Sequence, residues 1–150
     1  MPNFVLSILV LIILILQTRL GTIQFKLRVK NMNKQKQLKD VASIPSDQLE
    51  DWGNVPVPVS ETISTLRGLK ISENLDGSEA GLWESSPGTW VRQILDSEIS
   101  TFVKGKAIFT PDDGEPINIE AGDVVYFPAN STGVWEIIET TRKSYLTYKS

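Results

Sequence analysis

The sequence predicts a small all-β protein, an antiparallel jelly roll, on the basis of three observations. Short runs of β-branched and aromatic residues recur along the second half of the chain, clusters of Gly, Pro, Asn and Asp separate them, and no convincing long helix interrupts them. The chain has 150 residues, which is enough for a single hydrophobic core. We expect about eight to ten strands, with the barrel domain over residues 61–150.

The clearest pair of strands is a hairpin formed by Lys106 to Thr110 and Ile117 to Ile119. The cluster Pro111-Asp112-Asp113-Gly114 between them has the composition of a tight turn, with Gly114 at a position that needs positive φ. Val124 to Phe127 is wholly apolar and predicts a buried strand, which the following proline ends because it has no amide hydrogen for the ladder.

The segment before the barrel, residues 32–60, is expected to be an extended lead-in. Ser46 to Trp52 predicts one helical turn, with Ser46 as N-cap and Leu49 and Trp52 packed inward. Val55 to Val59 alternates with proline and cannot form a central strand. It is expected to be either an edge strand or an arm across a neighbouring subunit.

The order of these elements and their residues resemble the cupin family. Glu98, Phe102, Val103 and Gly105 are similar to the end of the first cupin motif, and Gly122 with Pro128 to the second. A more particular resemblance, over Glu61 to Lys149, is to the (S)-ureidoglycine aminohydrolase-like subfamily, with similarity also to the ethanolamine-utilisation cupins. It rests on Trp83-Glu84, Pro87-Gly88, Trp90, Asp112-Asp113-Gly114, Gly122-Asp123, Phe127-Pro128-Ala129, Gly133, Trp135-Glu136 and Arg142-Lys143. The resemblance implies a double-stranded β-helix, a jelly-roll barrel, and by analogy a homodimer.

The residue types exclude the metal chemistry that the resemblance would otherwise imply. In metal-dependent cupins three His and one Glu hold the ion, but Arg92, Ile94 and Gly133 stand at the His positions and only Glu98 remains. The chain has no His and no Cys, so a Ser-His-Asp or Cys-His site is also excluded. We therefore expect no metal and no cofactor.

The interior of the predicted barrel supplies the candidate ligand-binding residues. If Glu98 faces inward, burial would raise its pKa unless a cation pairs with it, and Arg92 is the natural partner. The tryptophans at family positions either line a pocket or fill the core, and a strand tyrosine could supply a hydroxyl. The candidates are Glu98, Arg92, Trp83, Trp90, Trp135 and Tyr145, with Tyr126 as a second hydroxyl.

The pair Arg142-Lys143 begins a predicted strand near the end of the chain. We expect Lys143 to be a solvated edge residue and Arg142 to pair with Glu136 or Glu139.

The two ends of the chain differ in charge. Residues 1–43 carry seven Lys or Arg against one Asp, whereas residues 44–150 carry eight against seventeen Asp or Glu. An acidic barrel domain argues against nucleic acid as a partner. Residues 1–31 hold an apolar run followed by basic residues. They are either a membrane anchor through residues 4–25, tethering a cytoplasmic domain to the inner face of the membrane, or an upstream extension before Met32.

Three functions are compatible with these residues. The first is a metal-independent cupin that binds a small polar or carboxylated molecule in its barrel. The second is an aminohydrolase-like enzyme of ureide or amino-acid nitrogen metabolism that uses an unusual site. The third is a structural or regulatory dimer whose barrel is filled by its own side chains.

Overall fold

The computed structural model describes residues 35–149 and confirms the all-β fold. The chain divides into two units, Met1–Gln37 and Leu38–Ser150, and the strands given below lie in the second. The N-terminal apolar run lies outside the described residues, among which no helix has the length and apolar character needed to cross a bilayer. The strands are β1 (Glu50–Asn54), β2 (Thr65–Glu73), β3 (Glu79–Ser85), β4 (Gly88–Ile94), β5 (Ser97–Lys104), β6 (Lys106–Pro111), β7 (Ile117–Glu120), β8 (Val124–Phe127), β9 (Ser131–Ile137) and β10 (Thr141–Tyr148).

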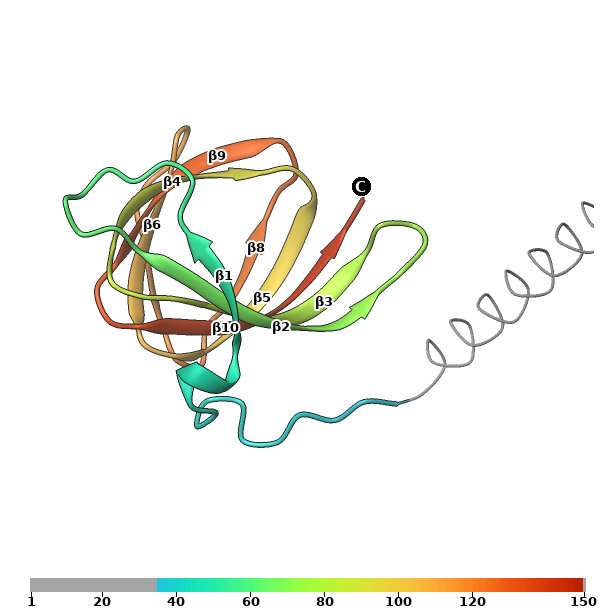
Figure 1. Ribbon diagram of the computed structural model, residues 1–150. Helices are drawn as coiled ribbons and strands as arrows, with labels where there is room; N and C mark the ends of the chain where they lie inside the picture. The colour runs from blue at the N-terminus through green and yellow to red at the C-terminus, as the bar shows by residue number, and fades with distance from the viewer. Residues whose placement is uncertain (1–34, 150) are drawn as a thin grey trace, which may run out of the picture. The chain divides into compact units, whose positions relative to one another are not determined.

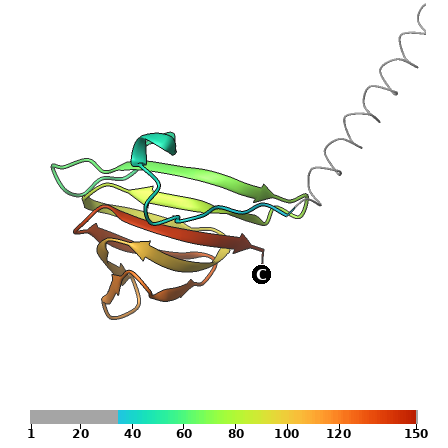
Figure 2. The same ribbon diagram turned by 90° about the horizontal axis from the view of Figure 1, so that it is seen from below.

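Two antiparallel sheets enclose the core of the second unit (Figure 1). One sheet has six strands in the order β1-β2-β3-β10-β5-β8, and the other has four in the order β4-β9-β6-β7. The last strand, β10, therefore lies in the middle of the larger sheet, between β3 and β5, as the view in Figure 2 shows. This position brings the C-terminal strand next to two strands from the first half of the barrel.

The predicted hairpin is present as β6 and β7, which pair from Lys106 opposite Glu120 to Phe109 opposite Ile117. The expectation of positive φ at Gly114 is wrong, because Gly114 is not among the residues with positive φ. Its amide instead donates to the carbonyl of Pro111, 3.3 Å away. Gly114 is thus the fourth residue of the turn, a position that favours glycine without requiring the left-handed region.

The prediction that Val124 to Phe127 is a buried strand is only partly correct. Phe127 is buried at 1% exposure, but Val124 and Tyr126 are 65% and 56% exposed. The strand is β8, the last in the larger sheet, and the two exposed side chains lie on its outer face. A wholly apolar run predicts burial on both faces, which an edge strand in this position does not receive.

The predicted helical turn is shorter than expected. Ser46–Gln48 forms a single 3-10 turn with Pro45 at its N-cap, and no side chain caps it. Leu49 is buried, as predicted, but Trp52 belongs to strand β1 rather than to the helix. The Trp52 ring lies against Gly68 of β2, where an added Cβ would be 2.1 Å from Cη2 of the indole.

The Val-Pro repeat lies along β4 of its own chain. Val55 is buried in the core, and Pro58 forms an isolated bridge with Trp90. The amide of Val91 donates to the carbonyl of Val57 at 2.9 Å, and the amide of Val59 donates to a carbonyl of the same strand at 2.7 Å. The segment therefore extends the edge of the smaller sheet, in agreement with the edge-strand alternative.

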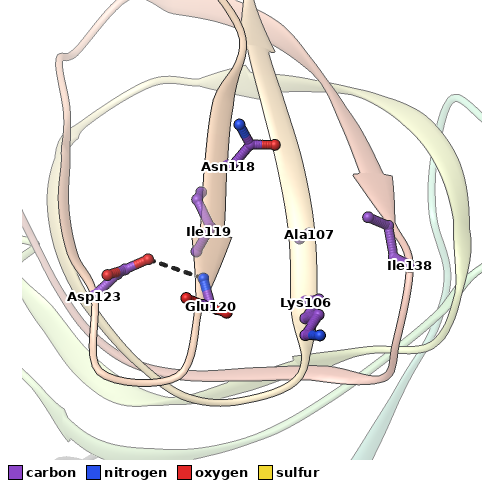
Figure 3. A pocket seen from close by; sticks show the side chains of 7 residues that line it. All are labelled: Lys106, Ala107, Asn118, Ile119, Glu120, Asp123 and Ile138. Carbon is purple, nitrogen blue, oxygen red and sulfur yellow. Dashed lines mark hydrogen bonds between the residues drawn. The ribbon is translucent and has the colours of Figure 1, made fainter.

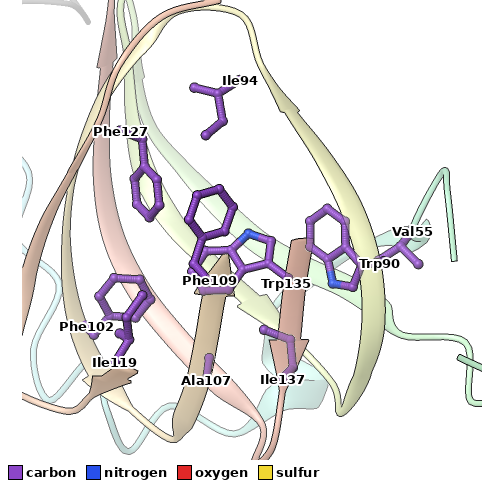
Figure 4. Packing of buried hydrophobic residues seen from close by; sticks show 10 residues of the cluster. All are labelled: Val55, Trp90, Ile94, Phe102, Ala107, Phe109, Ile119, Phe127, Trp135 and Ile137. Atoms are coloured by element: carbon purple, nitrogen blue, oxygen red, sulfur yellow. The ribbon is translucent and has the colours of Figure 1, made fainter. Parts of the chain in front are cut away.

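The core between the sheets is dominated by aromatic rings (Figure 4). The ring centroids of Phe109 and Trp135 are 4.9 Å apart, and Phe109 meets Phe127 edge-on at 5.1 Å. Such contacts add to the free energy gained from apolar burial. The buried apolar cluster consists of Val55, Trp90, Ile94, Phe102, Ala107, Phe109, Ile119, Phe127, Trp135 and Ile137.

A buried ion pair lies on the outer face of the larger sheet. Arg142 of β10 is opposite Glu84 of β3, and its Nε and Nη2 both donate to Oε2 of Glu84, at 2.8 and 2.5 Å. Its Nη1 donates to the carbonyl of Val41 at 2.7 Å. The expected pairing of Arg142 with Glu136 or Glu139 is therefore wrong. The register between β10 and β3 places Glu84 opposite Arg142, and this register cannot be read from the spacing of the two residues in the sequence.

Candidate functional site

Three charged side chains and one hydroxyl meet inside the barrel. Glu98 of β5 accepts hydrogen bonds from Arg92 of β4 at one carboxylate oxygen, and from Lys143 of β10 at the other. The hydroxyl of Ser100 donates to the second oxygen at 2.5 Å. The Glu98 and Lys143 side chains are 4% and 1% exposed, whereas Arg92 is 18% exposed. We call these four residues the Glu98 cluster.

Strand alternation explains why Glu98 faces inward. Side chains at every second position of a strand share a face, so Glu98 and Ser100 lie on the same side of β5 as Phe102, a core residue. Lys143 is paired with Phe102 in the ladder between β10 and β5, which places it on this interior face too. The expected ion pair of Glu98 with Arg92 is present.

Lys143 is the residue of this cluster that sequence reasoning missed. It was expected to be a solvated edge residue, but it is buried in the structure. Because Arg142 and Lys143 are consecutive in β10, they point to opposite faces of the sheet, and each meets a buried carboxylate there. The Arg142-Lys143 dipeptide, which the chain shares with the subfamily it resembles, was the sequence signal for this residue. Placing Lys143 in the interior would have required β10 to be recognised as a central strand.

Aromatic rings surround the Lys143 ammonium. Its Nζ is 4.8 Å from the ring centroid of Trp83 and 5.1 Å from that of Phe127. The rings of Phe102 and Trp135 are each 5.9 Å away. These distances are within the range of cation–π attraction, which partly replaces the lost hydration of the ammonium.

Burial and charge move the pKa values of both ionised partners. Burial alone would raise the pKa of Glu98, but the charges of Lys143 and Arg92, with hydrogen bonds from Lys143 and Ser100, lower it to about 2. The pKa of Lys143 falls to about 7. Burial is the largest cause, the positive charge of Arg92 adds to it, and the attraction of Glu98 offsets only part of the two.

The three candidate tryptophans lie together, and two of them are in the core. Trp90 and Trp135 are buried at 3% and 0% exposure, whereas Trp83 is half-buried and stacks on Trp135 at 6.1 Å. Nε1 of Trp90, Nε1 of Trp135 and Nη1 of Arg92 are buried and have no hydrogen-bond partner within residues 35–149. Buried donors without acceptors are costly, so an acceptor would be stabilised beside any of these three nitrogens.

Tyr145 lies farther along β10, in a separate polar chain. Its hydroxyl donates to Glu79 at 2.5 Å, and Glu79 also pairs with Lys70 at 2.7 Å. Burial and the neighbouring Glu79 raise the pKa of Tyr145. Tyr126, the other tyrosine considered, is exposed and lies 3.3 Å from Ser97 Oγ, hydroxyl to hydroxyl. Neither hydroxyl forms a hydrogen bond with the Glu98 cluster.

The residues at the cupin ligand positions do not fit a metal ion. Ile94 is in the apolar core, Arg92 brings a positive charge, and the ammonium of Lys143 is already bound to Glu98. At Gly133 an added Cβ would be 2.4 Å from Cζ of Phe109, so the ring takes the space of a side chain. The part of the chain that the structure describes contains no group of three or more His, Cys, Asp or Glu suited to a metal.

A pocket of 220 Å³ lies at another place, on strands β6 and β7 (Figure 3). Asp123 accepts a hydrogen bond from the amide of Glu120 at its rim, at 2.9 Å. The lining of this pocket includes none of the candidate ligand-binding residues. Its lining consists of Lys106, Ala107, Asn118, Ile119, Glu120, Asp123 and Ile138.

Comparison with known proteins identifies the same fold. Residues 72–145 match the family model of the EutQ-like cupin domain. No curated protein matches the chain. A protein described as ethanolamine utilization protein Q from Salmonella typhimurium is 20% identical, with a TM-score of 0.50, over 56% of this chain and 69% of its own.

Two further solved structures are similar. The EutQ protein of Clostridium difficile is 18% identical, with a TM-score of 0.50, over 58% of this chain and 64% of its own length. A protein of unknown function from Pseudomonas syringae pv. tomato is 18% identical, with a TM-score of 0.60, over 66% of this chain and 43% of its own. At such identities the likeness concerns the fold.

Proposed function

We propose that the barrel of this chain, whose residues 72–145 match the EutQ-like cupin domain, binds a small carboxylated molecule beside Arg92, without a metal ion. The observation that carries the proposal is the unpartnered buried donor Nη1 of Arg92, and Nε1 of Trp90 and of Trp135 are also unpartnered in the same barrel. All three are donors, so the group that each lacks is an acceptor. A carboxylate has two acceptor oxygens and forms charge-assisted hydrogen bonds with a guanidinium.

The charge of the cluster favours an anion as the ligand. Arg92 and protonated Lys143 carry two positive charges, and Glu98 carries one negative charge, so the protonated cluster has one positive charge in excess inside the barrel. A buried excess charge is costly, and a bound carboxylate would neutralise it. Arg92 is the most exposed of the three charged side chains in the Glu98 cluster, so a ligand would reach the site past its side chain.

Binding without a metal is part of the proposal. The ammonium of Lys143 supplies a positive charge next to Glu98, the carboxylate that resembles the metal-binding Glu of other cupins. The cation beside Glu98 is therefore a side chain of the protein and not a bound metal ion. Metal analysis of the purified protein is expected to find substoichiometric Mn, Fe, Ni and Zn, and one metal ion per chain would overturn this part of the proposal.

A thermal-shift screen tests the binding. Acetate, lactate, pyruvate, amino acids and ureides are added to the wild type, to Arg92→Met and to the control Lys106→Met, which removes an exposed positive charge away from the cluster. A carboxylate ligand at a hundred times its Kd is expected to stabilise the wild type and the control by about 2.7 kcal/mol. Arg92→Met should lose this stabilisation. Equal stabilisation of all three proteins would contradict the assignment of Arg92.

A further inference from the structure

Three neighbouring strands of the larger sheet expose apolar side chains on their outer face. In the order β10-β5-β8, the register places Leu146 opposite Ile99 and Ile99 opposite Tyr126. These side chains are 44%, 43% and 56% exposed. Val124 is two positions before Tyr126 in β8, so it shares the same face, and it is exposed too. We call Leu146, Ile99, Tyr126 and Val124 the outer patch.

The outer patch departs from the usual pattern of a sheet that faces water. An antiparallel sheet with one wet face carries polar side chains on that face, whereas single exposed apolar residues need no explanation. Here the apolar residues are contiguous across three strands, because residues that face each other in adjacent strands have Cβ atoms about 4.5–5.5 Å apart. A contiguous exposed apolar patch is typical of an interaction site.

The lead-in segment covers another part of the same face. Leu82 of β3 lies on this face, two positions before Glu84, yet it is buried at 1% exposure. On that side of the sheet Arg142 donates to the carbonyl of Val41. Within residues 35–149 nothing comparable lies over the outer patch, whose side chains stay exposed. The outer patch is therefore the part of this face that the described chain leaves uncovered.

The charges of the domain favour a second copy of this chain as the partner. The row next to Ile99 consists of Ser144, Thr101 and Val124, so neither row of the patch carries a charge. Residues 44–150 carry eight Lys or Arg against seventeen Asp or Glu, so two copies repel each other except where they meet at a neutral surface. A partner of opposite charge would be recognised through charged side chains, and these two rows offer none.

We propose that two copies of this chain pack their outer patches face to face about a two-fold axis. Such an axis brings the same surface of both chains together, so apolar side chains meet apolar side chains. Two sheets that pack in this way bury the facing side chains of both layers. Ile99 follows Glu98 in β5 and points to the opposite face, so the interface supports the strand that carries the Glu98 cluster. The proposal does not require a ligand in the barrel.

Sedimentation velocity of the full chain over a range of concentrations tests the proposal. The wild type is expected to form a dimer. Ile99→Glu and Leu146→Glu each place two carboxylates in the interface, one from each copy, and should raise the dimer Kd at least about a hundredfold. The control Ile138→Glu changes a similarly exposed isoleucine between β9 and β10 and should leave the Kd unchanged. A monomeric wild type, or a dimer that both patch variants retain, would overturn the inference.

Hydroxyl-radical labelling of Tyr126 identifies what covers the patch. In a dimer formed through this face, protection of Tyr126 should increase with protein concentration, in parallel with the dimer fraction, and should be lost in Ile99→Glu. Protection that does not depend on concentration would indicate a cover from the same chain and would rule out a second copy as the partner. Because the wild type is labelled, this measurement remains decisive even if a variant does not fold.

Discussion

Lys143 and Glu98 form an ion pair between neighbouring strands, with 1% and 4% of their side chains exposed. The ammonium comes from β10, the last strand of the barrel, and the carboxylate from β5. The same carboxylate binds Arg92, so one anion is shared by two cations. The structure therefore depends more on the anion of this cluster than on either cation.

Replacement of Glu98 by glutamine should strongly destabilise the protein. The change leaves Arg92 and Lys143 inside the barrel without a counter-ion, and we expect the free energy of unfolding to fall by about 3–5 kcal/mol. Urea denaturation measures this value. The matched control is Glu136→Gln, at an exposed position of β9, which should change stability by less than about 0.5 kcal/mol. A similar small change for Glu98→Gln would show that the cluster is not buried in solution.

Replacement of Lys143 by methionine should cost much less. Glu98 keeps Arg92 and Ser100 as partners, and the methionine side chain fills the space among the aromatic rings. We expect a change of less than about 1.5 kcal/mol in either direction. Lys143→Ala should lose about 2–5 kcal/mol relative to Lys143→Met, because it leaves a cavity. If Lys143→Met and Lys143→Ala lost the same free energy of unfolding, loss of the ion pair and not loss of packing would explain the effect.

The stability of the wild type should rise with pH in two separate ranges. Glu98 has a pKa of about 2 in the folded chain against 4.5 as its ordinary value, so its contribution is present above pH 4.5 and is lost as the pH falls through 2. Lys143 has a pKa of about 7 against 10.5, so the unfolded chain binds more protons between these values. In both ranges the free energy of unfolding then increases with pH, by at most about 1.4 kcal/mol per pH unit for each group.

The variant Lys143→Met isolates the upper range. Its free energy of unfolding is measured by urea denaturation from about pH 7 to pH 10. This value should be nearly independent of pH over the range in which the free energy of unfolding of the wild type increases. A wild-type curve that is flat or falls in this range would contradict the lowered pKa of Lys143.

Replacement of Arg142 by methionine should both destabilise the protein and release its lead-in segment. The change removes the partner of Glu84 and the donor to the carbonyl of Val41, and we expect a loss of about 3–5 kcal/mol. Hydrogen exchange near residues 41–49 should accelerate more than in the barrel strands. The control Lys106→Met breaks an exposed ion pair 3.9 Å long and should cost about 0–1 kcal/mol. Unchanged exchange near Val41 would show that Arg142 does not hold this segment.

Part of the candidate site could be predicted from the sequence because Glu98 and Arg92 lie in the motif that resembles the cupin family. The inward direction of Glu98 and its pairing with Arg92 were predicted from their positions in the resembled motif, and the structure shows both. The third charged member, Lys143, was assigned to solvent. Nothing near it in the sequence indicates that β10 lies between β3 and β5, with one face of the strand in the core and the other covered.

Burial also depends on where a strand lies in its sheet. The apolar run of β8 was predicted to be buried, but Val124 and Tyr126 are exposed because β8 ends the larger sheet. Arg142 shows the opposite case, in which a charged residue is fully buried by register with Glu84 and by contact with Val41. Hydrophobicity alone predicts neither result.

By itself the sequence determined the all-β fold and the β6–β7 hairpin, because composition, turn residues and strand periodicity act over a few neighbouring positions. The inward position of Glu98 followed from the resemblance to the cupin motif. Only the tertiary structure decided that Lys143 meets Glu98 and that Arg142 meets Glu84. Both contacts join residues more than forty positions apart. Their formation depends on the order of strands in the sheet, which the pairing of distant segments sets.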